Sequence, residues 1–191
     1  MGDHKDHNVH SDHKDDADDP EARARQVCLR LLTLAPRTRA QLADALRKRG
    51  IPDTVAAGVL DRYADVGLID DAAFARAWVE SRHYSRGLAG RALAAELKQR
   101  GVDSGEIRDA VEELGPDAEV ATARKLVAQQ LAGTRGQPAQ ARTRRLAGML
   151  ARKGYPPGLA FRVIREAMEA EGADGAPGEE PYFDDPDAFT E

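Results

Sequence analysis

A motif of six residues, with leucine at its first position and glycine at its fifth, occurs three times in this chain of 191 residues. Residues 46–51 read LRKRGI, residues 97–102 read LKQRGV and residues 150–155 read LARKGY, so that the glycines lie 51 and 53 residues apart. A period near 50 residues is longer than tetratricopeptide or ankyrin repeats and leaves room for three helices per unit. The repetition predicts an array of modules that stack because one short unit cannot bury its apolar stripe alone.

The residues around each glycine predict two helices in every unit. Leucines lie eight and four residues before the glycine, which is the i, i+4 spacing of a buried helical stripe: Leu42 and Leu46, Leu93 and Leu97, Leu146 and Leu150. The glycine suits the end of that helix, because it adopts the left-handed conformation there without a steric penalty. Apolar residues nine and ten positions later mark the next helix: Val59 and Leu60, Ala110 and Val111, Val163 and Ile164.

A further helix precedes each of these pairs, at approximately residues 22–35, 71–86 and 118–132. We therefore expect an all-α fold, an elongated and curved array of three tandem three-helix repeats with about nine helices. Helix-start signals agree with this division: Thr38 with Gln41, Asp103 with Glu106, Asp70 or Asp71, and Pro116 with Asp117.

The composition divides the chain into a body and two tails. We expect three-helix repeats at residues 21–69, 70–115 and 116–171, with disordered acidic tails at residues 1–20 and 172–191. The tails lack periodic apolar residues and cannot repay the entropy of ordering.

Both tails carry residues that invite a functional interpretation. The first holds His4, His7, His10 and His13 among aspartates, a pattern that binds a metal only loosely without a scaffold and that also resembles an acidic expression tag. The second holds three aromatic residues among its acids, for which an exposed solubilising role is favoured over a short docking motif: Tyr182, Phe183 and Phe189.

The net charge of −5 hides a basic body. Residues 1–20 and 173–191 together contain 14 acidic and two basic residues, which leaves 26 basic and 19 acidic residues between them, a net charge of +7. A polyanionic partner is therefore compatible with the body.

The strongest imbalance lies between Arg124 and Arg165, where ten basic residues occur without one acidic residue: Arg124, Lys125, Arg135, Arg142, Arg144, Arg145, Arg152, Lys153, Arg162 and Arg165. Arg142, Arg145 and Arg152 recur at helical spacings and are predicted to share one face. Such a face binds phosphates or carboxylates, and the alternative is a solvated surface rich in arginine.

Other candidate residues favour structural roles. Asp70 and Asp71 suggest capping of the following helix rather than metal binding, because no third ligand lies nearby in the sequence. Phe74 and Trp78, four residues apart, are more typical of a core than of a base-stacking platform. His83 stands alone, which favours a surface or interfacial role over catalysis.

The sequence contains none of the common catalytic, phosphate-binding or zinc-binding motifs, and we expect neither an enzyme nor a cofactor. Cys28 is the single cysteine and is predicted to be a small core residue, so that disulfide-dependent export gains no support. No apolar run is long enough for a membrane helix, and residues 1–20 are too polar for a signal peptide. We expect a cytoplasmic protein without a membrane partner.

One segment carries a more specific signal. Residues 67–76 read GLIDDAAFAR, and they are followed by Arg82, Gly87 and residues 96–102, which read ELKQRGV. Over about residues 21–171 the chain resembles the RecX family of regulatory proteins. The acidic pair with its phenylalanine, followed about 20 residues later by the glycine motif, is fairly specific, whereas single leucine and glycine positions are not. The matching residues include Asp70, Asp71, Phe74, Arg76 and Arg82.

The resemblance implies a monomer that binds RecA filaments on single-stranded DNA, limits their growth or promotes their disassembly, and so inhibits ATP hydrolysis, strand exchange and recombination during DNA repair and the SOS response. It implies no cofactor. The acidic tails are not part of the family pattern. Candidate contacts to RecA or to DNA phosphates are the body's cations: Arg124, Lys125, Arg142, Arg144, Arg145, Arg152, Lys153, Arg162 and Arg165.

Two other functions are also compatible with the sequence. Three-helix units with basic faces also hold phosphate backbones, so the chain is alternatively a DNA-binding protein that acts without RecA. The third interpretation is a helical scaffold for another protein.

Overall fold

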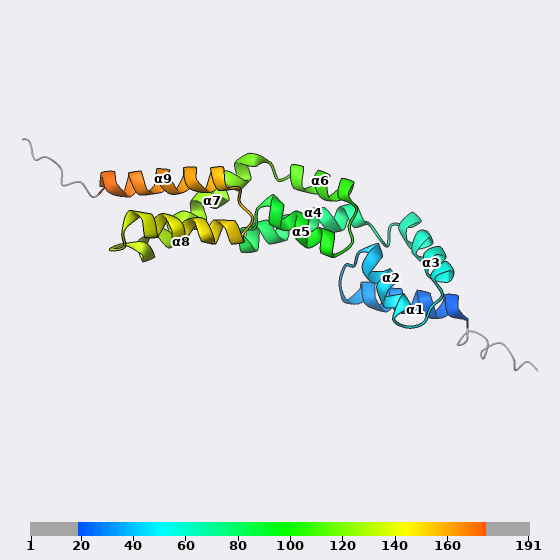
Figure 1. The fold of residues 1–191 in the computed structure, drawn as a ribbon. Coiled ribbons are helices and arrows are strands. Elements are labelled where there is room, and N and C mark those ends of the chain that lie inside the picture. The colour runs from blue at the N-terminus through cyan, green and yellow to red at the C-terminus, as the bar shows by residue number, and fades with distance from the viewer. Residues whose placement is uncertain (1–18, 175–191) are drawn as a thin grey trace, which may run out of the picture. The chain divides into compact units, whose positions relative to one another are not determined.

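A computed structural model of the chain describes residues 19–174, and within that range it contains α-helices, one short 3-10 helix and no strand (Figure 1). The all-α tandem-repeat fold predicted from the sequence is confirmed there. In chain order the helices are α1 (Pro20–Leu34), α2 (Arg39–Arg47), α3 (Asp53–Asp65), α4 (Asp71–Arg86), α5 (Gly90–Gln99), α6 (Ser104–Glu112), α7 (Pro116–Leu131), η1 (Ala132–Thr134), α8 (Ala139–Arg152) and α9 (Pro157–Asp174).

The described chain divides into two compact units, one that ends at Glu119 and one that begins at Val120. The first holds α1 to α6, that is repeats 1 and 2, and the second holds most of α7 with α8 and α9, that is repeat 3. The histidines of the first tail and the aromatic residues of the second lie outside the described residues. Among residues 19–174, no helix combines the length and the apolar character that crossing a membrane requires.

Each repeated glycine ends its helix as predicted, with φ of 72°, 77° and 90° at Gly50, Gly101 and Gly154. The residue that follows each glycine donates its N–H to the carbonyl of the leucine that lies four positions before the glycine. The N to O distances are 3.2 Å for Ile51 to Leu46, 3.3 Å for Val102 to Leu97 and 3.1 Å for Tyr155 to Leu150. This is the Schellman arrangement, which satisfies carbonyls that the helix end leaves open. All three donating residues are also buried.

Capping hydrogen bonds confirm the predicted starts of α2, α4 and α6. Thr38 and Gln41 form a reciprocal capping box, with both N to O distances at 3.2 Å. Asp70 accepts a hydrogen bond of 2.7 Å from the N–H of Ala73 and so caps α4, and Asp103 caps α6. No cluster of metal-ligating side chains occurs in the part of the chain that the structure describes. Capping is therefore the observed role of the acidic residue that precedes α4.

The repeated leucines lie in the core of each repeat, and all six are at most 1% exposed. In repeat 1 they pack with Ala24 and Cys28 from α1, which confirms the core position predicted for the cysteine. Burial of a leucine side chain stabilises a fold by about 1.5–3 kcal/mol. The apolar residues nine and ten positions after each glycine are buried too, except Val111, which is half-buried.

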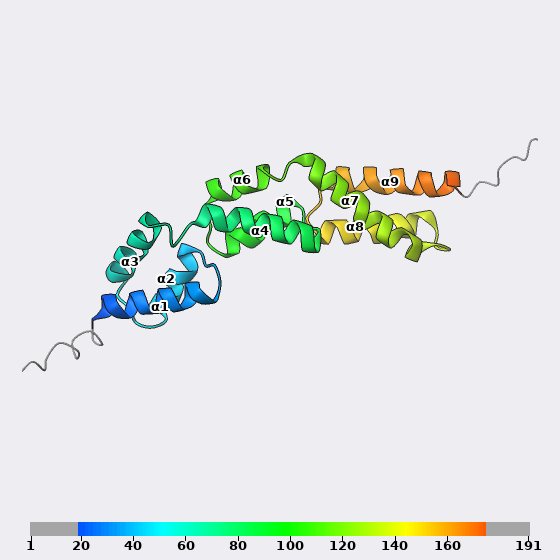
Figure 2. The same cartoon turned by 180° about the vertical axis from the view of Figure 1, so that it is seen from behind.

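Figure 2 shows the helices of the first unit, α1 to α6, from behind. Within this unit, repeats 1 and 2 meet at the N-terminus of α2. The Thr38 hydroxyl donates a hydrogen bond of 2.6 Å to the carbonyl of Arg100, at the end of α5. The N–H of Arg39 donates a hydrogen bond of 2.9 Å to the carboxylate of Asp71, the first residue of α4. Burial raises the pKa of Asp71 above its ordinary value, against the lowering effect of the Arg39 contacts. The two repeats are therefore joined by partly buried polar contacts.

The close approach at this joint also requires glycine at position 101. A Cβ atom added to Gly101 would lie 2.3 Å from the Cβ of Ala40, far inside the contact distance of two carbons. The equivalent Gly50 has the same left-handed backbone, but an added Cβ there meets nothing within 4 Å. Position 101 therefore needs glycine both for its backbone conformation and for the space.

The same kind of contact recurs one repeat later. Gly90 stands eleven residues before its repeat glycine, as Arg39 does, and its N–H donates a hydrogen bond of 2.5 Å to the carboxylate of Glu119. Glu119 lies four residues before an Ala-Arg pair, as Asp71 does. In both cases the first turn of one repeat's first helix supplies a carboxylate to the N-terminus of the preceding repeat's second helix. Such an N-terminus attracts negative charge because its N–H groups lack partners within the helix.

In repeat 2 the aromatic pair packs against the core, as predicted. The rings of Phe74 and Trp78 stack with centroids 5.8 Å apart. The guanidinium groups of Arg82 and Arg100 lie 4.3 Å and 3.6 Å from the Trp78 ring centroid. The indole N–H donates a hydrogen bond of 2.8 Å to the carboxylate of Glu96. These contacts occupy the tryptophan within the repeat.

The surface position expected for His83 is wrong. Its side chain is 8% exposed, and Nδ1 lies 2.8 Å from the carbonyl oxygen of Leu88. The helix α4 ends at Gly87, which has a φ of 63°, and the carbonyl of the next residue, Leu88, meets the imidazole ring. The histidine therefore links the end of α4 to the loop that follows.

Candidate interaction surface of the third repeat

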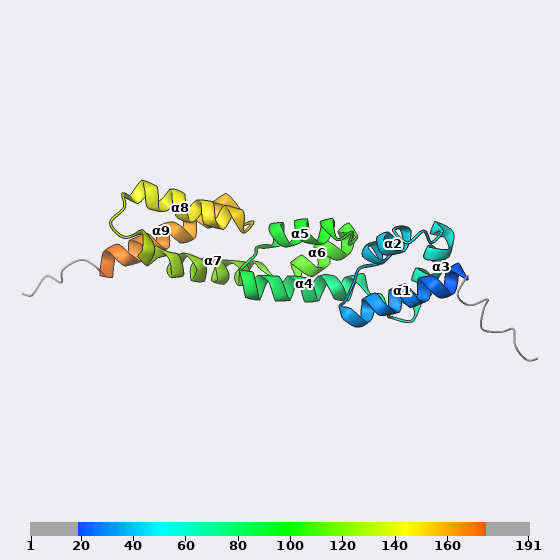
Figure 3. The same ribbon diagram turned by 90° about the horizontal axis from the view of Figure 1, so that it is seen from below.

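The ten cations that the sequence analysis singled out lie on α7, on α8, on α9 and on the segments that join them (Figure 3). They belong to the second compact unit, in which α8 and α9 run side by side (Figures 1 and 3). Helices α7 and α9 are linked by the ion pair between Arg124 and Glu166.

Four of the ten cations are paired with glutamates that follow the acid-free stretch. Arg124 on α7 contacts Glu166 with 3.0 Å between Nη2 and Oε2, and Arg165 lies 3.8 Å from Glu169. The two arginine side chains are 59% and 70% exposed. Exposed pairs of this kind contribute about 0–1 kcal/mol, so a polyanion can take the place of the glutamate at little cost.

Glu171 forms a more enclosed contact with the other two arginines. Arg135 Nε lies 2.7 Å from Glu171 Oε1, and Arg142 binds the other carboxylate oxygen. Arg142 also donates a hydrogen bond of 3.0 Å to the Thr134 hydroxyl. Hydrogen bonds from Arg135 and then Arg142 hold the pKa of Glu171 below its ordinary value. This contact ties α9 to α8 and to the segment before α8.

The structure therefore differs from the predicted shared face of Arg142, Arg145 and Arg152. The side chain of Arg142 is only 15% exposed because it turns inward to Glu171. Arg145 and Arg152, seven residues apart on α8, are exposed and lie on one side of the helix.

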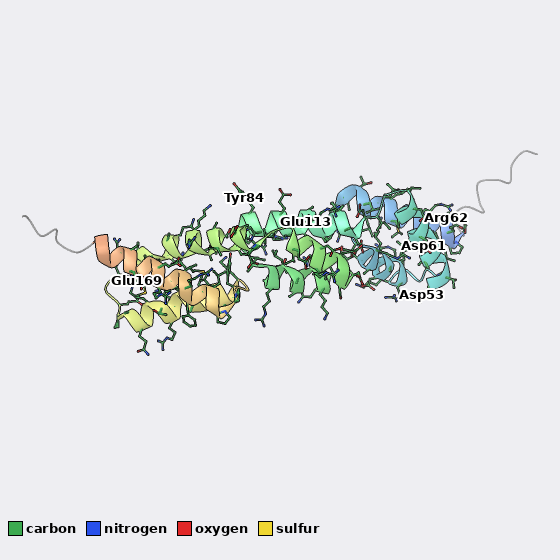
Figure 4. The ribbon with its side chains drawn as sticks, turned by 90° about the horizontal axis from the view of Figure 1, so that it is seen from above. Asp53, Asp61, Arg62, Tyr84, Glu113 and Glu169 are labelled. Atoms are coloured by element: carbon green, nitrogen blue, oxygen red, sulfur yellow. The ribbon has the colours of Figure 1, made fainter. Side chains whose placement is uncertain are left out.

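Five cations remain exposed and make no ion pair with an acidic residue of the described chain: Lys125, Arg144, Arg145, Arg152 and Arg162. We call this set the open cations. In Figure 4, side chains with nitrogen at their tips extend from α8 on the side away from α9. Lys153, just after α8, is half-buried and is left out of the set. The open cations give repeat 3 a surface with strong positive potential.

The residues of the family motif are placed in the first unit, where most of them make contacts within the fold. Asp70 caps α4, Asp71 joins repeats 1 and 2, and Phe74 and Arg82 enclose Trp78. Arg76 is exposed on α4, at the position that Arg124 has on α7. The motif is thus explained largely by the architecture of repeat 2 and its joint with repeat 1.

Three family models match the chain in order. They describe the first, second and third three-helix domains of RecX and match residues 24–62, 70–111 and 117–164. This chain belongs to the RecX family. The third RecX domain spans most of the stretch that carries the open cations, so the basic surface is built on a family element.

Individual RecX proteins are similar over most of the chain. "Regulatory protein RecX" of Thermobifida fusca is 65% identical over 153 residues, which cover 80% of this chain and 83% of that protein. "Regulatory protein RecX" of Mycolicibacterium smegmatis is 51% identical over 148 residues, or 75% and 79% of the two chains. The crystal structure of RecX from Lactobacillus salivarius, 18% identical, superposes with a TM-score of 0.75 over 80% of this chain and 99% of that chain. The last comparison bears on the fold alone.

Sequence reasoning missed the three glutamates that pair with the basic stretch, namely Glu166, Glu169 and Glu171. They directly follow the stretch on α9. Their i, i+4 spacing identifies the Arg165 partner, but the pairing with α7 and α8 depends on how the three helices pack. Pairing with these glutamates distinguishes the cations that make contacts within repeat 3 from the open cations.

Proposed function

We propose that this RecX-family chain is a non-enzymatic regulatory protein that binds RecA filaments on single-stranded DNA. Binding lowers ATP hydrolysis and strand exchange by RecA and so modulates recombination, DNA repair and the SOS response. The proposal is supported by the three matched RecX domains and by the relatives named "Regulatory protein RecX". In this proposal the protein acts in the cytoplasm, where RecA filaments form, and it needs no cofactor.

The observation that carries the proposal is the set of open cations on repeat 3. Four of the five are arginines, whose planar guanidinium groups bind carboxylates and phosphates with two parallel hydrogen bonds. An assembly of RecA on DNA offers both kinds of anion. Because the open cations are not neutralised by acidic residues of the described chain, they meet such anions without first breaking an internal pair.

The paired cations are assigned a different role. Arg135 and Arg142 hold α8 and α9 through Glu171 and thereby fix the direction of the α8 surface. Arg124 and Arg165 sit in exposed pairs that exchange readily, so they join the contact once a polyanion is bound. Lys153 lies beside Arg152 and extends the same basic surface. The whole predicted set thus divides into direct contacts, exchangeable contacts and supporting contacts.

Tandem repeats provide several weak contacts rather than one strong one. A filament presents the same surface at every subunit, and a chain with three similar repeats can engage more than one of them. Binding of a second repeat is then intramolecular, which raises the overall affinity without any new type of contact.

The experiment that tests the proposal measures RecA ATPase on single-stranded DNA while the concentration of this protein is raised. We expect activity to fall at less than one molecule per RecA subunit. The triple variant Arg144→Glu, Arg145→Glu, Arg152→Glu reverses three open cations, so that an attraction of about 0.2–1 kcal/mol at each exposed position becomes a repulsion of similar size. We expect the half-inhibitory concentration to rise about 10- to 100-fold.

A matched control changes the same number of charges elsewhere. The variant Arg47→Glu, Arg62→Glu, Arg108→Glu alters three exposed arginines of repeats 1 and 2 that already have acidic partners. We expect it to inhibit nearly as well as the unmodified protein. Full inhibition by the repeat 3 variant would reject the assigned surface. Equal affinity for bare single-stranded DNA and for filaments would instead favour a DNA-binding protein that acts without RecA.

A further inference from the structure

Repeat 3 carries a groove between α8 and α9, of about 720 Å³, that no residue of the described chain fills. Its floor is apolar, with Phe161, Ile164 and Met168, and the Phe161 side chain is 54% exposed. Arg162 and Arg165 line its edge. An exposed phenylalanine in the same groove as two arginines favours a ligand that is both aromatic and acidic.

The position of the groove within the repeat is informative. It includes Thr143, which stands eleven residues before the repeat glycine, as Arg39 and Gly90 do. In repeats 1 and 2 this position meets a carboxylate, since the N–H of Arg39 binds Asp71 and the N–H of Gly90 binds Glu119. The groove of repeat 3 therefore includes the position that an acidic side chain contacts in each of the other two repeats.

The chain order of the acidic segments is also regular. Asp71 follows the end of α3 by six residues, and Glu119 follows the end of α6 by seven. After the end of α9 at Asp174, the next acidic residues are Glu179 and Glu180, which follow by five and six residues. Residues 179–183 read EEPYF and so bring two aromatic rings together with the two acids.

The N-terminus of α8 differs from its counterparts in one respect. Helix α8 begins at Ala139, four residues before Thr143, so the N–H of Thr143 lies inside the helix. The corresponding N–H groups of Arg39 and Gly90 are the ones that bind carboxylates in the first two repeats. Beside the groove of repeat 3, the cationic groups within reach of an anion are the guanidinium groups of Arg162 and Arg165.

We propose that residues 179–183 of the same chain dock into this groove. The carboxylates of Glu179 and Glu180 bind Arg162 and Arg165, and an aromatic ring of the segment packs on Phe161. Docking of this kind covers the apolar floor and neutralises part of the basic surface of repeat 3 until a competing polyanion displaces the segment. The ligand of the groove is thus an acidic segment of the same chain. It occupies a position like the one where a following repeat supplies its carboxylate to repeats 1 and 2.

The length of the chain permits this contact. Arg165 and Arg162 lie nine and twelve residues before the end of α9, distances of about 14 and 18 Å along a helix. Glu179 and Glu180 lie five and six residues beyond that end, where an extended chain reaches about 17 and 20 Å, and the long arginine and glutamate side chains add to that reach. A chain that turns back after α9 therefore brings its acidic residues to the groove. Glu169, labelled on α9 in Figure 4, pairs with Arg165 at 3.8 Å and must yield to the incoming carboxylate.

The test uses the full chain with the photoreactive residue benzoylphenylalanine in place of Phe183. We expect irradiation to crosslink position 183 to peptides that contain Phe161 or Met168. Mixed samples of isotope-labelled and unlabelled chains show whether the crosslink lies within one molecule. The double variant Arg162→Glu, Arg165→Glu is expected to lower the yield about fivefold, as the loss of two exposed charge contacts implies. The double variant Arg145→Glu, Arg152→Glu, with the same change of charge outside the groove, is expected to keep it.

Crosslinks scattered over the chain, crosslinks between molecules, or equal yields from the two double variants would each overturn the proposal. Circular dichroism verifies that both variants keep their helicity. The measurement involves neither RecA nor DNA, so its outcome is independent of the function proposed above.

Discussion

Replacement of Gly101 by alanine provides a sensitive test of the joint between repeats 1 and 2. The new side chain meets two penalties in the structure. With φ at 77°, any L-residue loses about 1–2 kcal/mol. Its Cβ would also lie 2.3 Å from the Cβ of Ala40, where about 3.5–4.0 Å is needed, and overpacking of this size costs about 1–3 kcal/mol.

The equivalent glycine of repeat 1 supplies the control. Gly50 has a φ of 72°, but an added Cβ there meets nothing within 4 Å, so Gly50→Ala carries the backbone penalty alone. We therefore expect Gly101→Ala to lower the free energy of unfolding by about 1–3 kcal/mol more than Gly50→Ala does. Urea titrations followed by circular dichroism measure the difference. Equal losses from the two substitutions would refute the close approach of the two repeats.

Three further predictions concern single side chains. Glu171→Gln is expected to destabilise the protein at neutral pH. Because the pKa of Glu171 is lowered in the folded protein, the stability advantage of the wild type is present above the ordinary value of 4.5 and is lost as the pH falls through the folded pKa. Thermal unfolding of both proteins across this pH range measures the difference. Leu97→Ala in the core of repeat 2 is expected to cost about 2–5 kcal/mol in urea unfolding, against less than about 1 kcal/mol for Leu29→Ala, whose side chain is 48% exposed; similar losses would contradict the assigned core. Asp71→Ala is expected to lower the free energy of unfolding by about 1–3 kcal/mol, because it leaves the N–H of Arg39 without its acceptor. Asp71→Asn keeps an acceptor and removes a charge that burial disfavours. We therefore expect Asp71→Asn to be more stable than Asp71→Ala in the same urea assay.

Local signals explain why so much of the fold was predictable. A glycine that ends a helix, a threonine or aspartate that begins one, and leucines at i, i+4 spacing all act within a few residues of the chain. The structure confirms each of them, from the left-handed Gly50 to the capping box of Thr38 and the buried Leu97. Repetition strengthened the prediction, because the same register in three copies is hard to produce by chance.

Contacts between distant segments were less accessible to sequence reasoning. Asp71 was correctly placed beside a helix start, but its bond to Arg39 joins residues 32 apart and depends on how two repeats stack. The contact between His83 and the carbonyl of Leu88 likewise depends on the turn at Gly87, where α4 ends. Neither contact has a signature in the order of neighbouring residues.

The candidate site shows the same division. The acid-free basic stretch was evident from composition, and the exposed positions of Arg145 and Arg152 agree with the predicted face. Arg142 was predicted to share that face because spacing on α8 alone decides which residues align. The structure turns it toward Glu171, a residue 29 positions away, and only the packing of α9 against α8 reveals this.

Co-sedimentation distinguishes a regulator of RecA filaments from a protein that binds DNA alone, because it measures the binding of this protein both to RecA filaments on single-stranded DNA and to the same DNA without RecA. We expect tighter binding to the filaments, and a loss of about tenfold or more for the triple variant Arg144→Glu, Arg145→Glu, Arg152→Glu. Filament binding that is no stronger than DNA binding, or that does not change in the triple variant, would rule out the proposed role of the open cations.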